Sequence, residues 1–116
     1  MNFVLIGGLS AALAVAFGAF GAHGLKKFAS PEQLGWWETA SHYHLAVALA
    51  TVLFGLLRLH KPGGPAAGLC LTLGTLLFSG SLYAMTLGAP RWFGAVTPLG
   101  GTAIIVGLVL LALAGR

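Results

Sequence analysis

Four long apolar runs joined by short polar links constrain the fold of this chain more than any other feature. Helices are expected at about residues 3–23, 31–59, 65–87 and 93–114. About 20 apolar residues in a helix cross the ~30 Å hydrocarbon core of a bilayer, whereas barrel strands are roughly half as long. Only helices and closed barrels satisfy every backbone amide in lipid. The sequence therefore predicts an all-α, integral membrane four-helix bundle, made of two helical hairpins in a single transmembrane domain over residues 1–116.

The composition agrees with lipid as the surrounding solvent. Hydrophobic residues make up 58% of the chain and charged residues 7%, against about 25% charge in a typical soluble domain. The net charge of +4 comes from six Lys and Arg against two acids, and these residues lie in loops and at chain ends without forming a basic stripe. The lipid bilayer is the expected partner, and nucleic-acid binding is not expected.

The first run, residues 3–22, carries no charge, and Asn2 is the polar residue that precedes it. A cleaved secretory signal would carry Lys or Arg there and would have a shorter apolar run of ~7–15 residues. We therefore expect a membrane helix here, with a cleaved signal as the alternative.

The second helix begins before its apolar run. Residues 30–33, Ser-Pro-Glu-Gln, form a capping box with proline at the first helical position, and Trp36 and Trp37 are typical interface anchors. The apolar part, residues 45–57, reaches only about 20 Å at ~1.5 Å per residue. It must recruit the preceding turns to cross the bilayer, which places His44 inside the membrane boundary. The first turns form an interfacial extension that either lies along the membrane surface or dips into it.

Small residues recur at four-residue spacing and predict close helix packing. The same ridges would also serve an oligomer interface, so a homo-oligomer or another membrane protein is an expected partner. The ridges are Gly7/Ala11, Ala14/Gly18/Ala22, Gly80/Ala84/Gly88 and Ala103/Gly107, and the glycines assigned to helix packing are Gly18, Gly21, Gly80, Gly100 and Gly101.

Polar side chains gather near the ends of the predicted helices that meet the first and third loops. In an alternating topology these ends lie on one side of the membrane, and polar groups inside a bilayer mark functional candidates because they are costly there. The alternative is structural, since Ser and Thr bond to a carbonyl one turn earlier or to a neighbouring helix, and Tyr belongs to the interfacial belt. The opposite halves are mostly apolar, with Ser10, Thr51, Thr72 and Thr75 as exceptions. The candidate polar or ligand site is His23, Glu38, His42, His44, Ser79, Ser81, Tyr83 and Thr97.

The histidines are weighed separately. His42 and His44 point about 200° apart on a helix, so one of them is expected to face His23 within hydrogen-bonding or one-water distance. Glu38 lies four residues before His42 and shares its helix face. A satisfied interhelical hydrogen bond is the expected role of these histidines, and proton sensing is an alternative because histidine titrates near neutral pH. Metal or haem ligation is sterically conceivable, but no metal-ligand spacing motif is present. We therefore predict no metal ligands, no cofactor and no catalytic residues.

Several segments resemble the YgdD/YwdK-like bacterial membrane family, which is described as a domain of unknown function and has an animal transmembrane relative. The resemblance implies a multi-pass membrane protein of the cell membrane and brings no established activity. Members often carry a second histidine at the position of Val47, which puts in question any mechanism that needs it. The matching segments are Gly18–Lys26, Ser30–Leu34, Trp37–Thr39, Tyr43–His44, Phe78–Tyr83 and Thr97–Gly101.

The favoured function is that of a multi-pass, non-enzymatic interaction or assembly protein whose polar site lies at the end with the first and third loops. The alternative is a small oligomeric transporter or channel for an ion or small solute. Proton-driven exporters usually need a carboxylate deep in a helix, whereas Glu32 and Glu38 both precede the apolar part of the second helix. A third reading, a haem-, metal- or quinone-associated protein, rests on the histidines.

The distribution of cations gives a weak preference for the orientation in the cell (inner) membrane. The side with the termini carries Arg58, Lys61, Arg116 and the terminal amine, and the other side carries Lys26, Lys27 and Arg91. By the positive-inside rule, both termini are expected in the cytoplasm.

Overall fold

The computed structural model describes residues 2–116 and contains four long helices. None of the described residues is in a strand, and all four helices are long and apolar enough to cross a membrane. The all-α, four-helix architecture predicted from the sequence is therefore confirmed. The helices are α1 (Phe3–His23), α2 (Pro31–His60), α3 (Ala66–Thr86) and α4 (Thr97–Ala114), with short 3₁₀ turns at Leu25–Lys27 and Arg91–Ala95.

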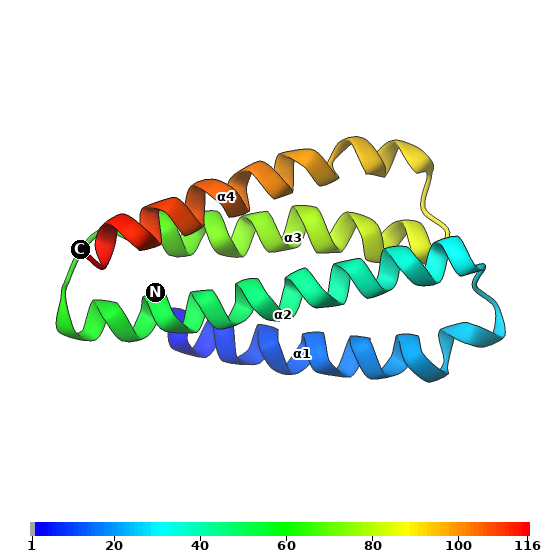
Figure 1. Cartoon of the computed structure of the whole chain (residues 1–116), viewed down its shortest axis with the longest axis horizontal. Coiled ribbons are helices and arrows are strands. Elements are labelled where there is room, and N and C mark those ends of the chain that lie inside the picture. Colours follow the sequence, from blue (N-terminus) through cyan, green and yellow to red (C-terminus); the bar gives the residue numbers. More distant parts are fainter. Residues whose placement is uncertain (1) are drawn as a thin grey trace.

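The helices are antiparallel and follow one another in space as they do in sequence (Figure 1). The main contacts are α1 with α2, α2 with α3, and α3 with α4. The central helices α2 and α3 are therefore covered on two sides, whereas α1 and α4 expose most of their surface. The two termini lie at the same end of the molecule, opposite the loops after α1 and α3 (Figure 1).

Local sequence signals fix the helix starts. Ser30 and Gln33 form the predicted capping box at the start of α2. This helix then runs without a break from Pro31 to His60, so its first turns continue the span and do not form a separate surface segment. Helix α4 begins at Thr97 and not at the expected residue 93, with Pro98 in its first turn. Proline lacks an amide hydrogen and fits only where no intrahelical partner is required.

Close approach of backbones holds each hairpin together. A Cβ atom at Gly100 would lie 2.3 Å from the backbone nitrogen of Phe78, which joins α4 to α3, and one at Gly7 would lie 2.7 Å from the carbonyl oxygen of Ala48. At Gly21 a Cβ would lie 2.3 Å from the indole ring of Trp37. Backbones this close gain dispersion contacts that do not depend on a hydrophobic driving force.

Three of the predicted packing glycines are not at such contacts. A Cβ at Gly18 would lie 3.8 Å from Ser41, one at Gly101 would lie 3.5 Å from the ring of Phe78, and one at Gly80 would meet nothing within 4 Å. The spacing of small residues identifies a helix face, but neighbouring positions on that face differ in how near the partner helix passes. Of the five predicted packing glycines, Gly21 and Gly100 therefore lie at the closest approaches, Gly18 and Gly101 lie at ordinary van der Waals distance from the partner helix, and Gly80 faces open space.

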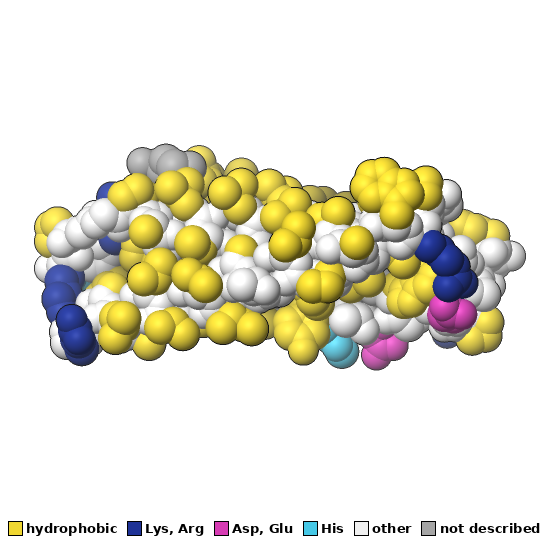
Figure 2. Space-filling model, turned by 90° about the horizontal axis from the view of Figure 1, so that it is seen from above, with side chains coloured by type: hydrophobic (Ala, Val, Ile, Leu, Met, Phe, Trp, Pro, Cys, Tyr) yellow, Lys and Arg dark blue, Asp and Glu magenta, His cyan; other side chains and the backbone are white. Residues whose placement is uncertain are grey.

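The surface matches a membrane environment. Figure 2 shows apolar side chains along the length of one face and Lys and Arg gathered at both ends. Large aliphatic side chains such as Leu9, Leu53, Leu76 and Ile105 are exposed, as expected where lipid tails cover the protein.

Candidate functional site

His44 is the polar residue around which the interior of the protein is arranged. It lies on the same face of α2 as Ala40, Val47, Ala48 and Thr51, which are all buried, because residues three and four apart share a helix face. Only 6% of the His44 surface is exposed. The apolar pattern of α2 therefore places an imidazole between helices, where it needs hydrogen-bond partners.

A hydrogen-bonded chain through His44 joins three helices. The Oγ of Ser10 on α1 lies 2.9 Å from His44 Nε2, and the hydroxyl oxygen of Tyr83 on α3 lies 2.9 Å from His44 Nδ1. Both ring nitrogens are thus satisfied. Tyr83 is itself buried, with 9% of its surface exposed.

An aromatic cluster packs against this chain on the side of the first loop. The ring of Tyr83 contacts Phe17 at 4.9 Å and Trp37 at 4.5 Å between centroids. The indole nitrogen of Trp37 donates a hydrogen bond to the carbonyl oxygen of Phe17 at 2.6 Å. Helices α1, α2 and α3 are therefore tied together on this side of His44.

A groove of about 450 Å³ lies between α1 and α3. The two helices contact each other through Phe17 and Tyr83 and again where the ring of Phe3 packs on Gly68. Between these contacts they separate, and α2 contributes part of the lining. Apolar lining residues include Ile6, Leu9, Leu13 and Leu76, and polar ones are Ser10, His44, Thr51, Thr72, Thr75, Ser79 and Tyr83.

The groove lies at the middle depth of the helices. Its lining on α1 runs from Ile6 to Phe17, about 16 Å at ~1.5 Å per residue, within a helix about 30 Å long. His44 is therefore inside the span, as its short apolar run predicts, but it lies farther from the loop than the helix end at which the polar site was expected, and it meets Ser10 from the opposite half of α1. Helix α2 is 30 residues long, so a residue near the start of its apolar run already lies far from the loop.

The three candidate residues of α3 contact two different helices: Ser79 and Tyr83 contact α2, and Ser81 contacts α4. Ser79 Oγ donates to the carbonyl oxygen of Ala40 on α2 at 2.8 Å, and Tyr83 lies on the same face. Ser81 is two residues from each and points about 200° away, so its Oγ pairs with Thr97 Oγ1 on α4 at 2.6 Å. The predicted site is thus two separate polar groups, one around His44 and one between Ser81 and Thr97.

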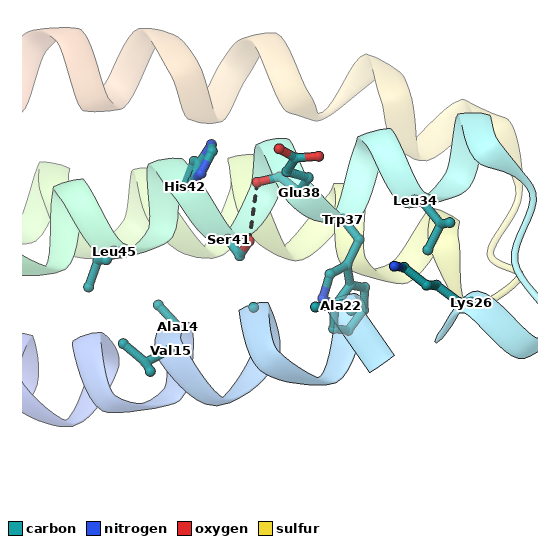
Figure 3. Close-up of a pocket in the computed structure, with 12 residues that line it drawn as sticks. Ala14, Val15, Ala22, Lys26, Leu34, Trp37, Glu38, Ser41, His42 and Leu45 are labelled. Carbon is teal, nitrogen blue, oxygen red and sulfur yellow. Dashed lines mark hydrogen bonds between the residues drawn. The ribbon is translucent and has the colours of Figure 1, made fainter. Parts of the chain in front are cut away.

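His23, Glu38 and His42 are exposed and do not join either group. Figure 3 shows Trp37 directed toward α1, whereas Glu38 and His42 point away from it. Among residues 2–116, no hydrogen bond or ion pair joins Glu38 to His42, or His23 to His42 or His44. His44 turns toward Ser10, which is about 20 Å from His23 along α1 at ~1.5 Å per residue, so the predicted hydrogen bond between His23 and His44 is not formed.

Ser10 is the participant that sequence reasoning missed. The signal in the sequence is that Ser10 places a hydroxyl group in the middle of an otherwise apolar run, where it needs a hydrogen-bond partner. Its register against His44 depends on how α1 packs on α2, which residue spacing within one helix does not reveal.

Ser10 and His44 are hydrogen-bonded as a catalytic nucleophile and its general base would be. Among the described residues, the other groups that such a catalytic site needs are not beside them. Acyl transfer also needs donors for the oxyanion, and in the middle of α1 the backbone amides are used by the helix. The group on Nδ1 is a tyrosine hydroxyl and not the carboxylate of a catalytic triad. In the described part of the chain, no three His, Cys, Asp or Glu side chains are placed to hold a metal ion.

Comparison with known proteins decides the family. A family model described as "Protein of unknown function (DUF423)" matches residues 17–101. The chain belongs to this family. This DUF423 protein is 39% identical over 115 residues to UPF0382 membrane protein YwdK of Bacillus subtilis (strain 168), covering 97% of this chain and 94% of that one.

Other relatives agree. A UPF0382 membrane protein of Staphylococcus epidermidis is 39% identical over 113 residues, covering 97% of this chain and 93% of the relative. One of Haemophilus influenzae is 36% identical over 113 residues, covering 96% and 90%. No solved structure matches. The predicted family is confirmed, and this DUF423 protein is a multi-pass membrane protein of a family whose function is not described.

Proposed function

We propose that this DUF423 protein is a non-enzymatic membrane protein that binds a lipid-soluble small molecule in the groove between α1 and α3. The observation that carries the proposal is the groove itself, a mostly apolar hollow into which a few polar groups converge. Small-molecule sites in proteins generally have this character.

The depth of the groove supports a ligand that arrives through the lipid. The groove is lined by the middle of α1 and α3, and the side chains around it, such as Leu9 and Leu76, are exposed on the lipid-facing surface. A ligand dissolved in the bilayer could enter sideways between the helices. Neither transport nor haem binding is favoured by a specific observation among residues 2–116.

The location that we propose is the cell (inner) membrane, with both termini in the cytoplasm. The relatives named as membrane proteins are bacterial, and the end with the termini carries Arg58, Lys61 and Arg116. Assembly with further copies or with another membrane protein stays a prediction.

Filling the groove tests the proposal. Because a Cβ at Gly80 would meet nothing within 4 Å and this residue lines the groove, Gly80→Leu should occupy the space without moving a helix. Gly8→Leu is the matched control, since Gly8 also has open space around its Cβ and does not line the groove. Both proteins are reconstituted in liposomes with a C12 hydrocarbon that carries a diazirine, irradiated, and mapped by mass spectrometry.

The wild-type protein and Gly8→Leu should show saturable labelling of Leu13 and Leu76 that unlabelled dodecane competes away, and Gly80→Leu should lose it. Circular dichroism checks the fold, and Leu76→Trp gives a second way to fill the groove. Labelling that rises in proportion to probe and is equal in all variants would mean that lipid contact alone was detected and would overturn the proposal.

A further inference from the structure

The Ser10–His44–Tyr83 chain has more hydrogen-bond donors than it has hydrogen bonds between its three side chains. With a neutral imidazole the three side chains carry three polar hydrogens, one each. The two contacts, Ser10 with His44 and His44 with Tyr83, use two of them. Whichever ring nitrogen is protonated, one O–H donor remains, on Ser10 in one arrangement and on Tyr83 in the other.

The imidazole is expected to be neutral because nothing nearby would balance its charge. The acids of this chain, Glu32 and Glu38, are both exposed, and neither lines the groove. An unpaired charge buried among apolar side chains at mid-membrane is strongly unfavourable.

The remaining donor has no acceptor within the described chain. Ser10 Oγ and Tyr83 OH make no hydrogen bond among residues 2–116 other than those to His44. Both residues line the groove. A polar group without a partner in an apolar environment is costly, so the unused donor of the chain calls for an acceptor inside the groove.

The charges around the groove limit what that acceptor can be. Its lining contains no Lys, Arg, Asp or Glu side chain, so neither an anion nor a cation would find a counter-charge there. Phospholipid ester carbonyls lie near the headgroup region, whereas the groove lies at the middle of α1. We infer, on the basis of the proposed function, that the ligand is an uncharged, lipid-soluble molecule with an alkyl chain and a ketone- or quinone-type carbonyl, whose oxygen accepts a hydrogen bond from the free O–H group of the Ser10–His44–Tyr83 chain.

The test compares two competitors that differ by one carbonyl oxygen. Tridecan-2-one and tridecane are titrated against the diazirine probe in liposomes of ether-linked phosphatidylcholine, with concentrations expressed per lipid. Because one hydrogen bond is worth about a fivefold change in affinity, the ketone should compete about fivefold more strongly. The infrared stretch of the ¹³C-labelled ketone should also move to lower frequency when the protein is present.

The triple variant Ser10→Ala, His44→Leu, Tyr83→Phe removes every donor of the chain and should bring the ratio of the two competitors to about one. The double variant Ser81→Ala, Thr97→Val removes the hydroxyl pair between α3 and α4, which does not line the groove, and should leave the ratio unchanged. If the triple variant does not fold, the wild-type ratio and infrared band still test the inference.

The outcomes separate the two proposals. Equal competition by ketone and alkane would leave a binding groove and overturn the inference about its ligand. No competition by either would overturn the proposed function, and the inference with it. If liposomes of ester-linked lipid alone protect the groove from labelling, the acceptor is a lipid ester, and the assignment to a ketone or quinone is overturned.

Discussion

Replacing Gly100 and Gly101 one at a time should separate close backbone packing from helix propensity. Both residues lie in the first part of α4, so alanine changes the intrinsic preference for helix to a similar extent at each, by up to ~1 kcal/mol. They differ in what the new methyl group meets. At Gly101 it would lie 3.5 Å from the side chain of Phe78, whereas at Gly100 it would lie 2.3 Å from the backbone nitrogen of the same residue and 2.8 Å from the carbonyl carbon of Leu77.

The clash at Gly100 can be relieved only by moving a helix. Non-bonded carbon atoms are most stable at ~3.5–4.0 Å, so α3 and α4 would have to separate locally by about 1 Å. A gap of this size forfeits roughly a quarter to a half of the dispersion energy of each contact, and inserted methyl groups in packed interiors cost about 1–3 kcal/mol. Gly100→Ala should therefore be about 2 kcal/mol less stable than Gly101→Ala.

The measurement is reversible unfolding in mixed detergent and dodecyl sulfate micelles, followed by circular dichroism. Gly101→Ala should be as stable as the wild type or slightly more stable. If the free energies of unfolding of the two variants agree within about 0.5 kcal/mol, the spread seen for changes without a structural consequence, the close packing of α3 and α4 at this point is refuted.

The other predictions concern the hydrogen bonds and the orientation. Tyr83→Phe should lower the free energy of unfolding by about 0.6 and at most ~1.7 kcal/mol, the range for hydrogen bonds between membrane helices, whereas Tyr43→Phe, at a half-exposed position, should have no effect; equal effects would contradict the role of the His44 chain. Trp37→Phe removes the hydrogen bond to α1 and should lower the free energy of unfolding by about 1 kcal/mol. An equal decrease in Trp36→Phe would argue against that hydrogen bond. In a bacterial host, a C-terminal fluorescent-protein fusion should be bright and an alkaline phosphatase fusion inactive; the opposite result would reverse the orientation.

In the candidate site, the pattern of a single helix predicts which residues are buried but not which residues of other helices they contact. His44 was expected inside the membrane boundary because the apolar part of its helix was too short, and the structure buries it. Ser79, Ser81, Tyr83 and Thr97 were expected together, yet only helix rotation decides which neighbour each one meets. The partner of His44 on the first helix could not be predicted, because residue spacing within one helix says nothing about register against another.

The glycines divide in the same way. The four-residue spacing predicts close packing of helix faces, and Gly7 and Gly107 of the predicted ridges lie at such contacts. At Gly18 and Gly80 the same spacing coincides with looser contact or open space, because the distance between two helices changes along their length.

The amino-acid sequence by itself determined the solvent, the number of helices and most of their boundaries. Those properties depend on apolar length, capping residues and proline, which act within one segment of chain. The tertiary structure alone decided that Ser10, His44 and Tyr83 form one hydrogen-bonded chain and that a groove opens beside it. Both follow from the packing of α1 and α3 against α2, and packing between helices is set by the shapes of whole faces in contact.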